Sequence, residues 1–188
     1  MKIYMLKMSL LIVSVALLLT ACFKDKPGET NEEEVITTMN IKFTPVTGGA
    51  AFMYSFDDAD GPGGIAPVQQ EIVLAANVSY HAEIELLNKT VSPAGNITTE
   101  VAAEAEAHRF FYQPSPTSNI VVNNLNNDAN GMPLGITGTW AAGGAGTGTL
   151  IITLRHYPGT PPDKQTADGV TSPKSTTDIA ISFTTRII

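Results

Sequence analysis

The stretch YHAEIEL, residues 80–86, alternates apolar and polar residues at every position. One set of alternate positions is apolar, namely Tyr80, Ala82, Ile84 and Leu86. The other set is polar, namely His81, Glu83 and Glu85. Because successive side chains of a β-strand point to opposite faces, this pattern predicts a strand with one buried and one solvated face.

The same period of two recurs on both sides of this stretch. It is clear from Val35 to Phe43, and further segments have strand character: residues 51–56, 68–74, 110–112, 119–125, 135–141, 147–156 and 178–187. Most are bounded by Gly, Pro, Asn or Asp, which favour turns. Short strands at this spacing predict an all-β fold, an immunoglobulin-like or Greek-key β-sandwich of about 8–9 strands, as a single domain over residues 35–188.

One segment departs from the strand pattern. Residues 100–108, EVAAEAEAH, are rich in Ala and Glu, which favour a helix, and Asn96 or Thr98 can cap its start. A helix of this length is not stable by itself, so packing on the sheet must hold it. We therefore predict one short crossover helix.

The N-terminus has the features of an export signal. Lys2 and Lys7 provide positive charge before the apolar run at residues 8–19. This run is too short to span a bilayer comfortably as a mature helix. Residues 1–21 are therefore predicted to be a signal peptide.

A cysteine follows the apolar run directly. The sequence LTAC, residues 19–22, resembles the lipobox of bacterial lipoproteins. This resemblance implies cleavage before Cys22 and acylation of its thiol, which would anchor the chain to a membrane. Residues 22–34 are charged and almost without apolar side chains, so we predict a flexible tether.

Composition excludes several classes of protein. Cys22 is the only cysteine, so the folded domain cannot use a thiolate for catalysis, for zinc binding or for an iron–sulfur cluster. Eleven Lys and Arg face eighteen Asp and Glu, a net charge of −7, and loss of Lys2 and Lys7 with the signal peptide makes it −9. Without a basic stripe, nucleic-acid binding is not expected. No Gly-x-Ser-x-Gly elbow and no P-loop lysine occurs, and we predict a non-enzyme.

Three residues have the spacing and chemistry of metal ligands. Glu104 and His108 are four residues apart in the predicted helix and so share one face. His156 ends a long predicted strand and is a candidate third ligand. Imidazole and carboxylate ligands suit zinc or another borderline metal. The alternative is a solvated helix face with a favourable charge near its C-terminus.

Two glycine-containing loops resemble calcium-binding loops, DDADGPGG at residues 57–64 and NNDANGMPLG at residues 126–135. The candidate ligands are Asp58, Asp60, Asn126, Asp128 and Asn130. The position of the bidentate Glu of an EF-hand is Pro67 in one loop and Thr137 in the other, so neither is an EF-hand. The alternative is a hairpin turn that uses Asx residues and Gly.

Residues 157–177 contain no periodic apolar pattern. A stretch of that length without regular structure is uncommon in a compact domain. We expect either a recognition loop or a flexible excursion.

Several motifs together resemble a known family. They include EEEVITT at 32–38, NITTEVAAEAEAHRFFYQ at 96–113 and LRHYPG at 154–159, besides the two glycine-containing loops. The chain resembles small lipoproteins of Bacteroidota that are often labelled "type 1 periplasmic binding fold superfamily protein". The fold in that label has two α/β lobes, whereas the residue pattern here predicts a β-sandwich. The resemblance implies a companion of outer-membrane transporters.

These observations predict a lipid-anchored, non-catalytic binding or accessory lipoprotein of the outer membrane, on its periplasmic or cell-surface face. Its ligand would be a divalent metal, zinc or calcium, captured for an outer-membrane transporter. The alternative is an interaction module that binds a protein or a surface polymer through its loops. Metal capture requires Glu104, His108 and His156 to converge, whereas an interaction module requires an exposed apolar patch.

Overall fold

A computed structural model describes residues 34–61 and 63–188. The predicted signal peptide (residues 1–21), Cys22 and the predicted tether up to residue 33 lie outside the described residues. Within the described part, no helix has the length and apolar character needed to cross a membrane. The described residues form 11 strands and one short α-helix.

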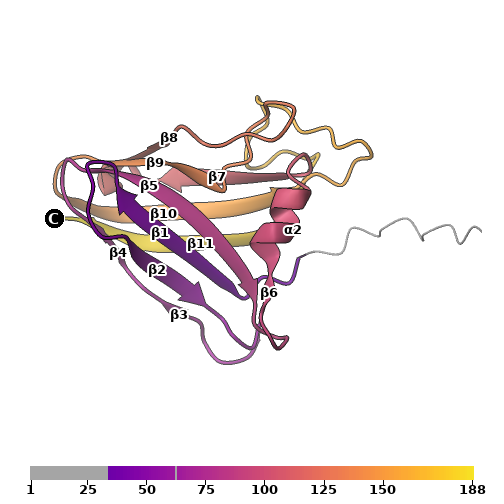
Figure 1. Cartoon of the computed structure of the whole chain (residues 1–188), viewed down its shortest axis with the longest axis horizontal. Helices are drawn as coiled ribbons and strands as arrows, with labels where there is room; N and C mark the ends of the chain where they lie inside the picture. Colours follow the sequence, from indigo (N-terminus) through magenta and orange to yellow (C-terminus); the bar gives the residue numbers. More distant parts are fainter. Residues whose placement is uncertain (1–33, 62) are drawn as a thin grey trace, which may run out of the picture. The chain divides into compact units, whose positions relative to one another are not determined.

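The strands form two sheets (Figure 1). The first has the order β3-β2-β1-β5-β9-β8, with β6 paired to β5. Its strands are β1 (Thr38–Pro45), β2 (Phe52–Asp57), β3 (Val68–Gln69), β5 (Ser79–Asn88), β6 (Gly95–Asn96), β8 (Ile120–Asn123) and β9 (Thr137–Ala142). The second has the order β4-β11-β10-β7, with β4 (Ile72–Leu74), β7 (His108–Pro114), β10 (Gly146–His156) and β11 (Thr176–Ile187). This arrangement confirms the predicted all-β sandwich.

The first sheet contains a Greek-key order. Strands β1, β2 and β3 pair in sequence, and β5 returns to the free side of β1, which gives β5-β1-β2-β3. Residues 68–74, predicted as one strand, divide between the sheets. Val68–Gln69 pairs with β2, whereas Ile72–Leu74 pairs in parallel with β11. This division and the short β6 account for 11 strands where 8–9 were predicted.

The inward faces of both sheets meet in one hydrophobic core. On β5 the apolar set predicted from the sequence is buried: Tyr80, Ala82, Ile84 and Leu86. The second sheet contributes buried residues from β10 and β11, among them Leu150, Ile152, Leu154 and Phe183. The polar face of β5 meets solvent, where Glu83 pairs with Lys42 of β1 at 2.9 Å. Alternation therefore sets which face of the sheet enters the core.

The helix α2 spans Ile97–Ala103 and thus begins and ends earlier than the predicted residues 100–108. The side chain of Asn96 caps it by accepting the Thr99 N–H at 3.1 Å. Ile97 and Val101, one turn apart, are buried and attach the helix to the core. Residues after Ala103 turn away, because the segment from His108 onward pairs with β10 as strand β7.

Residues 157–175 connect β10 to β11 without a regular element, as predicted. Cationic side chains of the sandwich hold this loop. The Arg109 guanidinium donates to three of its carbonyl oxygens, those of Gln165, Thr166 and Asp168. The Arg155 guanidinium donates to two more, those of Ser172 and Ser175. These hydrogen bonds attach the loop to β7 and β10, and the choice between a recognition loop and a flexible excursion stays a prediction.

Candidate metal centre

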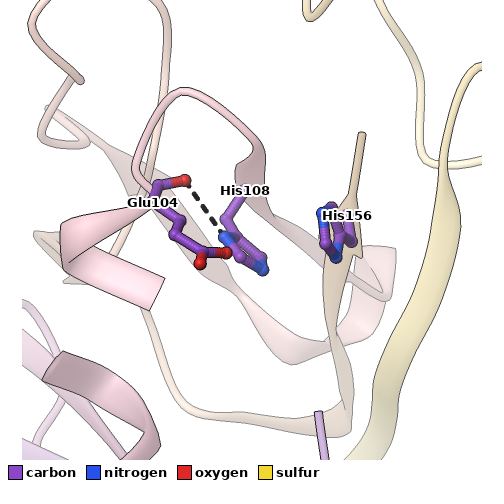
Figure 2. Close-up of side chains that lie close together, drawn as sticks. All are labelled: Glu104, His108 and His156. Atoms are coloured by element: carbon purple, nitrogen blue, oxygen red, sulfur yellow. Dashed lines mark hydrogen bonds between the residues drawn. The ribbon is translucent and has the colours of Figure 1, made fainter. Parts of the chain in front are cut away.

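Glu104, His108 and His156 meet at one end of the second sheet (Figure 2). Glu104 is the C-cap of α2, His108 is the first residue of β7, and His156 is the last residue of β10. One ligand atom from each residue lies within 4.8 Å of the other two. The three residues proposed from the sequence therefore converge, as a metal site requires.

Strand pairing brings the two histidines together. His108 and His156 are directly opposite each other in the antiparallel pair of β7 with β10. Directly opposed residues on antiparallel strands point to the same face. Their imidazole rings lie 4.5 Å apart between centroids, with an interplanar angle of 39°. The register of these two strands is therefore what creates the pair of nitrogen ligands.

A tight turn between α2 and β7 places Glu104 beside the two histidines. The N–H of Ala107 donates to the carbonyl oxygen of Glu104 at 2.8 Å, so the chain reverses before β7 begins. In Figure 2 the Glu104 carboxylate points toward the imidazole ring of His108. The predicted helical spacing of four residues brought the right side chains together, although a turn rather than a helix connects them.

The backbone of Glu104 also fixes the tautomer of His108. Its carbonyl oxygen, which can only accept, lies 3.1 Å from Nδ1 of His108 (dashed line in Figure 2). Nδ1 therefore carries the proton, and in the neutral ring Nε2 carries a lone pair. Among the described residues, this buried Nε2 has no hydrogen-bond partner. A histidine held in this way presents Nε2 as a metal ligand.

Burial keeps both imidazoles neutral. The side chain of His108 is fully buried, and this burial lowers its pKa to about 4, despite the opposing hydrogen bond to Glu104. Burial also lowers the pKa of His156, and the charge of Glu104 opposes that effect. At neutral pH both rings are therefore in the form that binds metals.

Two further carboxylates, those of Glu34 and Glu100, lie near Glu104. Glu104 is exposed and His156 is half-buried, so the cluster is accessible from solvent. Burial, followed by the neighbouring charges of Glu100 and Glu104, raises the pKa of Glu34. Carboxylates that lie close together raise the local concentration of cations.

The structure places beside the cluster an acidic residue that the sequence analysis did not single out. Asp178 of β11 has a fully buried side chain, and its Oδ2 lies 3.8 Å from Nε2 of His108. A β-bulge places it there, because Leu154 pairs with Ile179 while Arg155 pairs with Thr177. Asp178 is the extra residue between them. A β-bulge changes the direction in which a side chain points, and bulges are common near functional sites. The local sequence does not predict where this bulge lies.

Lys164 forms hydrogen bonds with the backbone next to the candidate metal centre. Its fully buried ammonium donates to the carbonyl oxygens of Ala105 at 2.6 Å and of His108 at 2.8 Å. The same nitrogen lies 2.8 Å from Oδ2 of Asp128, whose side chain is also buried. This ammonium therefore connects the long loop, the turn after α2 and the loop that contains Asp128.

The residues predicted to bind calcium lie in two turns. Oδ1 of Asp128 accepts the N–H groups of Asn130 and Met132, and its Oδ2 pairs with Lys164. Asn126 Oδ1 accepts the Thr137 N–H. In the turn at residues 57–64, Oδ2 of Asp60 accepts the Ile65 N–H. Asp58 lies two residues before Asp60 in the same turn. Gly61 and Gly131 have positive φ, as such turns demand. The side-chain oxygens that accept these N–H groups stabilise the turns. Calcium binding by either loop stays a prediction.

Comparisons with protein-family models, curated proteins and solved structures give no match for this chain. Membership of the Bacteroidota lipoprotein family therefore stays a prediction. The assignment of a function rests on the geometry and the electrostatics of the residues described above.

Proposed function

We propose that this protein binds one divalent transition-metal ion, with Zn²⁺ as the first candidate, through Glu104, His108 and His156. The observation that carries the proposal is the convergence of one ligand atom from each of these residues within 4.8 Å. Two of the three are neutral imidazoles, and the buried Nε2 of His108 has no hydrogen-bond partner among the described residues.

The ligand set selects the class of metal. Two imidazole nitrogens and a carboxylate suit Zn²⁺ and neighbouring divalent ions. Ca²⁺ prefers six to eight oxygen ligands, so this cluster favours zinc over calcium. Cys22 is the only cysteine in the sequence, so a site in the sandwich cannot include a thiolate from its own residues.

The proposed role is capture rather than catalysis, by an accessory lipoprotein of the outer membrane that serves a transporter. Three features support it: the lipobox-like LTAC at residues 19–22, the net negative charge and the solvent-accessible side of the cluster. An interaction module that uses its loops stays the alternative.

Calorimetric titration of the purified chain with Zn²⁺ tests the proposal. We expect one ion per chain, and we expect His108→Ala to weaken binding by more than about 100-fold, the upper range for loss of an outer-shell partner. The matched control is His81→Ala, because His81 is exposed and lies on β5 of the first sheet, whereas the two histidines of the cluster lie on strands of the second sheet. Equal binding by His108→Ala and the unmodified chain would refute the proposed site.

A further inference from the structure

The candidate metal centre supplies three ligands to an ion. One ligand atom each from Glu104, His108 and His156 lies within 4.8 Å of the other two, and no further His, Cys, Asp or Glu of the described residues belongs to this mutually close group. Asp178 is not a member, although its Oδ2 lies 3.8 Å from Nε2 of His108. Zinc in proteins has four ligands or more. An ion held here would therefore need a ligand from outside the group.

The burial of the three residues differs and defines the accessible side of the centre. The side chain of His108 is fully buried, His156 is half-buried and Glu104 is exposed. Solvent therefore reaches the cluster from the side of Glu104 and His156, whereas the chain covers His108. Zinc sites with three protein ligands bind water or a substrate at the remaining position. In this centre that ligand would come from solvent.

The charges near the cluster favour a neutral ligand over an anion. A divalent ion bound by two neutral imidazoles and one carboxylate keeps a single positive charge. The carboxylates of Glu34 and Glu100 lie near Glu104, and their negative charges oppose the approach of an anion. A neutral nitrogen donor such as imidazole avoids this repulsion and is a good ligand for zinc and its neighbours.

We propose that the centre is an open three-ligand site that captures its ion together with a small, neutral nitrogen-donor molecule of the imidazole type. This inference rests on the proposed metal binding and specifies the molecule that shares the ion. When the donor binds to an ion already in the centre, one metal–water bond breaks and one metal–nitrogen bond forms. Glu104, His108 and His156 stay bound throughout this exchange.

Titration of the Co²⁺-loaded chain with imidazole, and separately with azide, tests the open position. The visible absorption of Co²⁺ reports a change of ligand, and at about pH 8 free imidazole is neutral. We expect imidazole to change the spectrum to saturation, with one imidazole per ion. Azide should need an at least about 10-fold higher concentration. Equilibrium dialysis should show that Co²⁺ stays on the chain at each imidazole concentration.

A substitution at Glu100 tests the charge selection. Glu100→Gln removes one nearby negative charge and should tighten azide binding about 3-fold or more, while imidazole binding stays the same. The matched control is Glu71→Gln, because Glu71 pairs with Arg186 on β11, at the end opposite Thr176, the residue that pairs with His156. This control should bind both molecules as the unmodified chain does. Circular dichroism of each variant monitors folding.

The outcomes distinguish this inference from the proposed function. A Co²⁺ spectrum that imidazole does not change, or loss of Co²⁺ to imidazole without a shared complex, overturns the open site. Tighter binding of azide than of imidazole, or equal azide binding by Glu100→Gln and Glu71→Gln, overturns the preference for a neutral donor. In these cases the metal site itself stands, provided that His108→Ala loses the ion. An unmodified chain that binds neither Zn²⁺ nor Co²⁺ overturns both proposals.

Discussion

His108 and His156 lie directly opposite each other across strands β7 and β10, with ring centroids 4.5 Å apart. This relationship organises the centre, because strand register fixes both rings on one face while the turn after α2 adds Glu104. The sandwich thus supplies rigid positions for ligands that come from three separate segments of the chain.

Zn²⁺ should stabilise the folded protein. An ion that binds only the folded state raises the free energy of unfolding by about 2.7 kcal/mol when its concentration is 100-fold above the dissociation constant. Thermal unfolding with Zn²⁺ and then with excess chelator measures this effect. His108→Ala should show no such shift, and a shift of equal size in that variant would place the ion elsewhere.

Stability should fall in acid partly through His108. Burial lowers its pKa to about 4 in the folded chain, whereas the unfolded chain takes up this proton near pH 6.5. The unfolded state therefore binds more protons between these values, so stability decreases as the pH falls from 6.5 to about 4. The expected loss is on the order of 3 kcal/mol.

Urea denaturation of the metal-free protein across this pH range measures that loss. His108→Gln cannot titrate and should have a flatter profile, while His81→Gln serves as the control. Parallel profiles for His108→Gln and the unmodified chain would contradict a neutral, buried His108.

The buried pair of Lys164 with Asp128 should contribute strongly to stability. Removal of one partner, as in Asp128→Asn, leaves the other without its counter-ion in a buried site and should cost about 3 to 5 kcal/mol. The exposed pair Lys42 with Glu83 offers a control, since Glu83→Gln should cost under about 1 kcal/mol. Similar unfolding free energies for both variants would disprove the distinction.

Asn96 should hold the helix that precedes the centre. Its side chain accepts the Thr99 N–H, so Asn96→Ala should reduce the free energy of unfolding by about 1 kcal/mol. Asn130→Ala, at an exposed position in a turn, should change it less. Chemical denaturation of both variants checks the cap, and equal effects would argue against it.

The fold was largely predictable because it depends on a pattern of period two. Alternation at residues 80–86 identified the buried face of β5, and turn residues bounded most of the other strands. The crossing of residues 68–74 between the sheets was not predictable, since each half of that segment takes its partner from a distant strand.

The centre was predictable in part. The spacing of Glu104 and His108 selected the right pair, although strand pairing with β10 ends the helix at Ala103. The sequence analysis missed Asp178 and Lys164 because their positions beside the cluster depend on how the whole chain folds. One depends on a bulge in β11, and the other lies in a loop whose sequence suggests solvent exposure.

Crystals grown with Zn²⁺ and measured at the zinc absorption edge give the most direct test of metal binding. The proposed site predicts one anomalous peak at about 2.0–2.1 Å from Nε2 of His108, in contact with His156 and Glu104. No peak at this position, or a peak only in the turns at residues 57–64 and 126–135, would contradict it.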